Sequence, residues 1–63
     1  MVFTLSYKDK SETKWLKLDT AETKEKILEK YYAISRGWKI LKMDSFNLKV
    51  TDKDNNIIME YSP

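Results

Sequence analysis

A chain of 63 residues with 12 Lys or Arg and 10 Asp or Glu carries a formal net charge of +2, which is too small to argue for a polyanionic partner by itself. The chain has no cysteine and no histidine, which excludes disulfides and thiolate metal sites and removes the commonest general base. We therefore expect one small domain over residues 1–63 that is not an enzyme and has no metal and no cofactor.

The chain also lacks segments that would direct it to a membrane. No apolar stretch approaches the roughly 20 residues that span a bilayer. The first residues, MVFTLSYKDK, lack the basic region followed by a long apolar region that is typical of a signal peptide. We expect a cytoplasmic protein without a membrane partner.

The first part of the sequence predicts a hairpin. Residues 2–7 alternate between apolar and polar side chains, with Phe3, Leu5 and Tyr7 on one side, which is the period of a half-buried strand. The segment 8–12 is entirely polar and suits a loop. Residues 14–18 then resume an extended pattern.

Residues 20–36 predict a helix. Asp19 is placed to accept hydrogen bonds from the first free helical amides, and Glu22 is placed to reach back, as in a capping box. Gly37 is the only glycine and predicts the left-handed residue that commonly ends a helix. The apolar positions of the segment fall near one stripe, which consists of Ala21, Ile27, Leu28, Tyr31 and Ile34.

The rest of the chain predicts a meander of three strands over residues 38–43, 46–51 and 57–62. A two-residue turn at 54–55 sets Val50 opposite Met59 and Leu48 opposite Tyr61, because Asp and Asn both tolerate positive φ. The predicted fold class is α+β, with a five-stranded antiparallel sheet and one helix packed on one face. The predicted chain order is ββαβββ, and the predicted spatial order is 2-1-3-4-5.

The register of strand 38–43 has two solutions, since a slip of one residue turns every side chain to the other face. One solution buries Leu41 and Met43 under the helix, and the other buries Trp38 and Ile40. We expect the first solution. The predicted core then comprises Phe3, Leu5, Leu16, Leu18, Ile27, Leu28, Tyr31, Ile34, Leu41, Met43, Phe46, Leu48, Val50, Met59 and Tyr61.

The side of the sheet away from the helix is the predicted partner-binding surface. In the expected register it carries Trp15, Lys17, Trp38, Ile40, Lys42, Lys49 and Ile58. Such a surface fits an ordinary exposed face whose lysine stems cover the tryptophans, the centre of a protein interface, or a platform on which unpaired bases stack. Packing of two such faces into a homodimer is a further alternative.

One segment partly matches a metal-binding loop. Asp52, Asp54 and Asn56 occupy the first three ligand positions of a calcium loop, but Ile57 and Pro63 stand where that loop needs a glycine and a bidentate glutamate. We interpret the segment as an ordinary hairpin turn.

The order of the predicted elements resembles a known layout of strand, strand, helix and strand. It runs from Phe3 through the hairpin, the helix DTAETKEKILEKYY and the turn GWKILKM. The layout is similar to that of small phage-encoded inhibitors of host RNA polymerase of the T7 type, and to that of the epsilon subunit of some bacterial RNA polymerases. The resemblance covers residues 3–43 and rests on pattern without a diagnostic motif; residues 46–62 add two strands to it. It implies a protein that acts by binding a larger protein.

Together these observations predict a non-enzymatic binding module. We expect a small regulator or inhibitor, encoded by a phage or plasmid, that contacts a protein partner through its open sheet face or an edge strand. The alternative is a nucleic-acid-binding protein that uses Trp15, Trp38 and the surrounding lysines.

Overall fold

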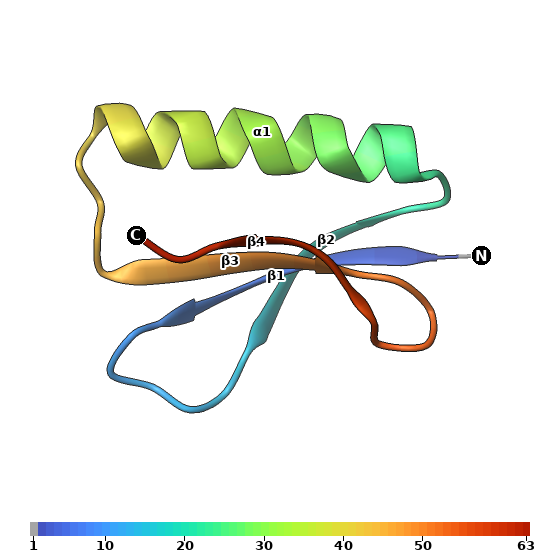
Figure 1. Ribbon diagram of the computed structural model, residues 1–63, viewed down its shortest axis with the longest axis horizontal. Coiled ribbons are helices and arrows are strands. Elements are labelled where there is room, and N and C mark those ends of the chain that lie inside the picture. Colours follow the sequence, from blue (N-terminus) through green and yellow to red (C-terminus); the bar gives the residue numbers. More distant parts are fainter. Residues whose placement is uncertain (1) are drawn as a thin grey trace.

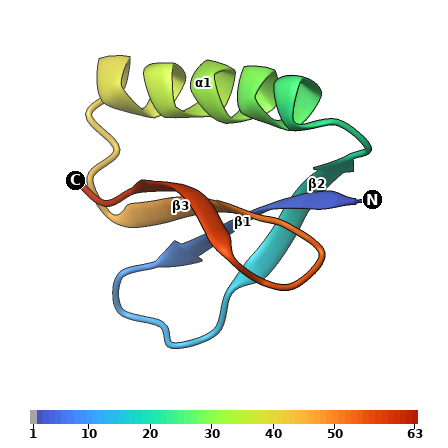
Figure 2. The same ribbon diagram turned by 45° about the vertical axis from the view of Figure 1, so that its right-hand side comes forward.

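The computed structural model describes residues 2–63. The elements in chain order are β1 (Phe3–Asp9), β2 (Leu16–Ala21), α1 (Lys24–Ile40), β3 (Phe46–Thr51) and β4 (Ile57–Tyr61). The strands form one antiparallel sheet in the order β2-β1-β3-β4, and α1 lies across one face of it (Figure 1, Figure 2). The predicted α+β class is confirmed. The predicted five strands and chain order ββαβββ are wrong, because the sheet has four strands and the chain order is ββαββ.

The error lies in residues 38–43, which form the end of the helix and the turn after it. The helix does not stop at Gly37, whose φ is not positive. Trp38 continues the apolar stripe formed by Ile27, Tyr31 and Ile34, and its ring packs against Phe46 at a centroid distance of 5.5 Å. Packing of the Trp38 ring between the helix and the sheet therefore favours a helix here, although the alternating pattern predicted a strand.

The helix ends in the hydrogen-bond pattern of a Schellman motif, in which a left-handed residue follows the C-cap. Leu41 is the C-cap, and Lys42 holds the left-handed position with φ of 56°. The amide of Met43 donates to the carbonyl of Trp38 at 2.8 Å, and the amide of Lys42 donates to the carbonyl of Lys39 at 3.3 Å. A lysine thus occupies the position that the sequence led us to assign to Gly37.

The helix also begins later than predicted. Its N-cap is Thr23, whose hydroxyl accepts a hydrogen bond from the amide of Lys26 at 3.2 Å. Asp19 lies in β2 instead, where it accepts from the amide of Thr20 and forms an ion pair with Lys30. The predicted capping box at Asp19 is therefore wrong, and the helix of 17 residues is displaced by about one turn from the predicted segment.

The β3–β4 hairpin confirms most of the predicted pairing. Strand β3 has the predicted bounds, and Val50 and Leu48 pair with Met59 and Tyr61 as expected. The turn is longer than the predicted dipeptide. A bulge next to Val50 compensates for the extra loop residue, so Val50 still pairs with Met59. Asn55 supplies the left-handed residue with φ of 68°.

The side chain of Asp52 holds this turn together. Its carboxylate accepts from the amides of Asp54 and Asn56, both at 2.9 Å. These hydrogen bonds, that from the Asn56 amide above all, hold the pKa of Asp52 below its usual value. Asp52 therefore acts as a turn-forming group, and the segment is a hairpin turn as the sequence indicated.

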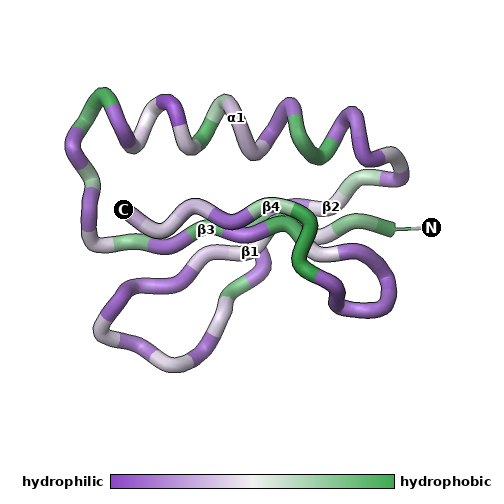
Figure 3. Tube along the Cα trace, in the orientation of Figure 1, coloured by the Kyte–Doolittle hydropathy of each residue, from purple (hydrophilic) through white to green (hydrophobic). Residues whose placement is uncertain are grey.

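The core lies between α1 and the sheet. Its buried residues are Phe3, Leu5, Ile27, Tyr31, Leu48 and Val50. Along α1 in Figure 3, short apolar stretches alternate with hydrophilic ones, as expected for a helix that buries one side. Three predicted core residues are in fact exposed, namely Leu16, Leu18 and Leu41, with 47%, 43% and 69% of their surface accessible.

The exposure of Leu16 and Leu18 follows from the position and shape of β2. This strand is an edge of the sheet, and its pairing with β1 is interrupted by a bulge between Leu5 and Ser6. A bulge increases the local twist of an edge strand. The first half of β2 accordingly turns away from α1 (Figure 1), so its leucines are not covered.

Candidate interaction surface

The strands place a row of lysines across the face of the sheet opposite α1, where Ser6 and Thr51 are buried. Leu5 and Val50 point toward the helix, so alternate residues of β1 and β3 point to the other side. Ser6 pairs with Lys17 on one side and with Lys49 on the other. The two lysines are therefore about 10 Å apart, which is the width of two strand spacings.

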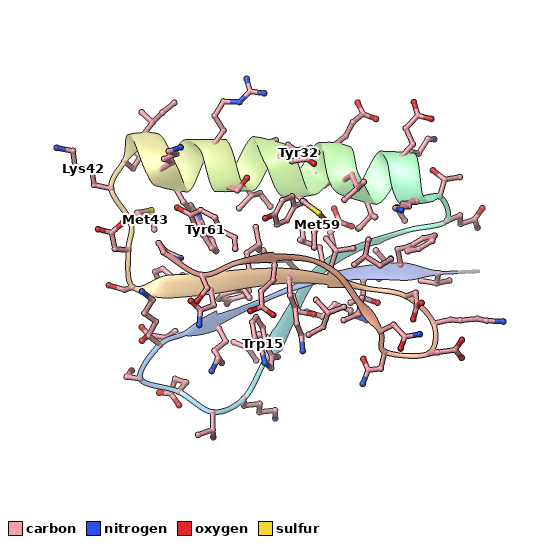
Figure 4. All side chains as sticks on the ribbon, in the orientation of Figure 1. Trp15, Tyr32, Lys42, Met43, Met59 and Tyr61 are labelled. Atoms are coloured by element: carbon pink, nitrogen blue, oxygen red, sulfur yellow. The ribbon has the colours of Figure 1, made fainter. Side chains whose placement is uncertain are left out.

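We call this surface the open face. By the register it comprises Thr4, Ser6, Lys8, Lys17, Thr20, Asn47, Lys49, Thr51, Ile57 and Glu60, together with Trp15 from the loop before β2. Figure 4 shows Trp15 beneath the sheet, on the side away from the helix. Three lysines and one glutamate give the open face a net positive charge.

Trp15 lies at the centre of a cation–π cluster. The ammonium group of Lys49 lies 4.3 Å from the centroid of the Trp15 ring, and that of Lys8 lies 5.4 Å from it. Both distances are within the range of about 6 Å for this interaction, which is worth about 0.5–1 kcal/mol at exposed sites. Contact with the ring orders the two lysines, so less side-chain entropy is lost when a partner binds them.

The open face contains only part of the predicted binding surface. Trp15, Lys17 and Lys49 are brought together as expected. Lys8 was missed because the sequence predicted that the first strand ends at Tyr7, whereas β1 continues to Asp9. The alternation of Thr4, Ser6 and Lys8 along the strand was the signal that could have identified it.

The remaining predicted site residues lie elsewhere. Trp38 is partly buried against the core, and its ring lies 5.5 Å from that of Phe46 and 6.4 Å from that of Tyr61. Ile40 and Lys42 are at the far end of α1, where Ile40 is 72% exposed. Ile58 is partly buried and packs against the core. The assignment of Trp38, Ile40 and Lys42 to the open face depended on the predicted strand 38–43 and is wrong, because these residues lie in α1 and the turn after it.

The loss of Trp38 and Ile40 from the open face changes its chemistry. Among the residues assigned to it, Trp15 is now its one aromatic group and Ile57 its one large aliphatic group. The others carry hydroxyl, amide, carboxylate or ammonium groups. Such a surface lacks the apolar centre that is typical of large permanent interfaces. It is suited to an anionic partner that engages ordered lysines.

The molecule is thus a small α+β protein with a cationic open sheet face. Comparisons with protein-family models, curated proteins and solved structures gave no match. Within residues 2–63, no helix combines the length and the apolar character needed to cross a bilayer.

Proposed function

We propose that this protein is a non-enzymatic binding module, a regulator or inhibitor that docks its open face against an acidic surface of a larger protein. The observation that carries the proposal is the cluster of Lys8, Trp15 and Lys49, with Lys17 in the same row of the sheet. Carboxylates on a partner can bind these ammonium groups while the tryptophan ring keeps them in place. The absence of histidine and cysteine supports a role without catalysis.

The geometry around Trp15 favours a protein partner over single-stranded nucleic acid. Stacking of a base requires a free face of the aromatic ring. Both Lys8 and Lys49 place their ammonium groups over the ring, so a base that stacks on a ring face they occupy would have to displace them. An acidic side chain can bind the same lysines without that rearrangement.

Bacterial RNA polymerase is the first partner to test. The resemblance to polymerase inhibitors depended on residues 38–43 being a strand, and these residues end α1 instead. What supports the proposal is the order of β1, β2, α1 and β3, which has the same strand–strand–helix–strand layout. That the partner is RNA polymerase, and that a phage or plasmid encodes the protein, are parts of this proposal.

The test is capture of purified RNA polymerase, and of partners from a bacterial lysate, on the immobilised protein. A variant with Lys17→Gln and Lys49→Gln should lose at least about tenfold in affinity, which corresponds to about 1.4 kcal/mol. The matched control is Lys24→Gln with Lys26→Gln, which removes the same charge from exposed positions of the helix. Equal loss in both variants would refute a specific role for the open face.

A second measurement separates the two classes of partner. Single- and double-stranded nucleic acids of mixed sequence are titrated into isotopically labelled protein, with the Trp15 indole signal followed by NMR. Shifts that weaken steeply with added salt would support nucleic-acid binding instead, because binding to phosphates releases counterions. Absence of shifts at low salt is the result that we expect.

A further inference from the structure

A second surface lies on the helix side of the molecule, at the opposite edge of the sheet from β2. Strand β4 is the last strand in the order β2-β1-β3-β4, so one of its edges is unpaired. Alternate residues of such an edge direct amide and carbonyl groups away from the sheet, where another strand can pair with them. Both edge strands carry a bulge, at Leu18 in β2 and at Ile58 in β4, so residues 59–61 are the regular part of the β4 edge.

The helix leaves the neighbourhood of β4 accessible. It packs mainly on β1, β3 and β2. Beside β4 it borders a shallow groove of about 370 Å³, lined by Tyr32, Ser35, Arg36, Lys39 and Tyr61. Figure 4 shows Tyr61 between β4 and α1, with Tyr32 on the helix. A second hollow of about 510 Å³, lined by Glu29, Tyr32, Ala33 and Arg36, shares Tyr32 and Arg36 with this groove.

The groove contains cations that have no anionic partner. Arg36 and Lys39 are exposed, and within residues 2–63 neither forms an ion pair with a carboxylate. The guanidinium of Arg36 offers a planar fork of donors that matches a carboxylate. The phenol groups of Tyr32 and Tyr61 add further donors beside the two cations.

From these features we propose that β4 and the groove bind an extended acidic peptide, which adds to the sheet as a further strand next to β4. Pairing with β4 would direct every second side chain of the peptide toward the helix, at intervals of about 7 Å. Arg36 and Lys39 are neighbours on the helix surface, with Cβ atoms about 5–6 Å apart. Successive inward-facing carboxylates of the peptide therefore meet Arg36 and Lys39. This site lies on the other side of the sheet from the open face and does not depend on it.

The proposal is tested by NMR with the isotopically labelled full chain and a short peptide, capped at both ends, in which glutamate alternates with threonine. We expect shifts at the amides of Ile57–Tyr61 and at the Arg36 side chain. A peptide with glutamine in place of glutamate should bind at least about tenfold more weakly. A peptide methylated on alternate backbone nitrogens should not bind, because it cannot pair with β4.

Variants of the protein identify the groups that select the acidic side chains. Arg36→Gln with Lys39→Gln should remove the preference for glutamate over glutamine, whereas the control Lys24→Gln with Lys26→Gln should retain it. The open-face variant, Lys17→Gln with Lys49→Gln, should bind the peptide as the unmodified protein does. This last result separates the failure of one site from the failure of the other.

Three outcomes would overturn the proposal. The first is a failure of strand pairing, seen either as no shifts at millimolar peptide or as binding that backbone methylation does not affect. The second is a set of shifts confined to the open face, which would place the acidic peptide at Lys8, Lys17 and Lys49. The third is a dimer in sedimentation equilibrium whose β4 amides shift on dilution, because a second copy of the chain would then occupy the edge.

Discussion

Replacing Gly37 with alanine is expected to stabilise the protein. Gly37 lies inside α1 with a φ that is not positive, and a Cβ atom at this position would meet no other heavy atom within 4 Å. Glycine in a helix interior costs about 0.5–1 kcal/mol relative to alanine, because it loses more backbone entropy on folding. The substitution should therefore raise the free energy of unfolding by about that amount, and the Tm by several degrees, since about 1 kcal/mol corresponds to 4–8 °C in a domain of this size.

The same reasoning predicts the effect of a change at the true end of the helix. Lys42 has a φ of 56°, a conformation that costs an L-residue about 1–2 kcal/mol and glycine almost nothing. Lys42→Gly should therefore also stabilise the fold, by less than the full amount because glycine gains entropy in the unfolded chain. The double variant tests whether the two effects add, as is usual for sites without shared partners.

Denaturant unfolding followed by far-UV circular dichroism and by tryptophan fluorescence measures both effects, and agreement between the probes checks two-state behaviour. The sign is decisive. If Gly37 were the left-handed residue that ends the helix, alanine would destabilise the protein by about 1 kcal/mol. Destabilisation by Gly37→Ala, or by Lys42→Gly, would refute the helix boundary described above.

Three further results are expected. Thr23→Ala should lower the free energy of unfolding by about 1 kcal/mol because it removes the N-cap, whereas Glu22→Ala, at the position of the predicted capping box, should change it little; equal effects would contradict the cap assignment. Trp38→Ala should destabilise by about 2–4 kcal/mol, in keeping with loss of a large packed ring, while Trp15→Ala should cost clearly less, and the reverse order in chemical denaturation would place the wrong tryptophan in the core. Stability should fall on acidification, because hydrogen bonds from Asn56 lower the pKa of Asp52 in the folded state: the stabilisation is present above the unfolded pKa of about 3.9 and is lost as the pH falls through the folded value. Asp52→Asn should flatten the dependence of Tm on pH below about pH 4, and an unchanged slope would contradict the role of this carboxylate.

Part of the open face could be predicted from the sequence, whereas the groove beside β4 could not. Trp15, Lys17 and Lys49 were predicted to share a surface because alternation along strands is a local property of the chain. Lys8 and the groove beside β4 could not be predicted in the same way. The groove requires that α1 packs mainly on β1, β3 and β2 and lies beside Tyr61 of β4, which is a relation between elements far apart in the sequence.

The sequence by itself determined the elements whose pattern has one interpretation. The sequence correctly predicted the α+β class, the strand over residues 46–51 and its pairing with the last strand. It also correctly predicted that Ile27 and Tyr31 lie on the buried side of one helix. In each case hydrophobic period and turn residues agree, so that local and long-range interactions favour the same structure.

Only the tertiary structure decided the segment around Gly37. Residues 38–43 alternate like a strand, yet Trp38 also continues the apolar stripe of α1, and periodicity alone cannot choose between the two. The choice follows from packing, because the helical form places the Trp38 ring against Phe46 and Tyr61. Burial of the Trp38 ring, together with the hydrogen bonds at the helix end, offsets the roughly 0.5–1 kcal/mol that glycine costs the helix and the roughly 1–2 kcal/mol that the left-handed Lys42 costs. As a result the sheet has one strand fewer than predicted, and Trp38 and Ile40 do not lie on the open face.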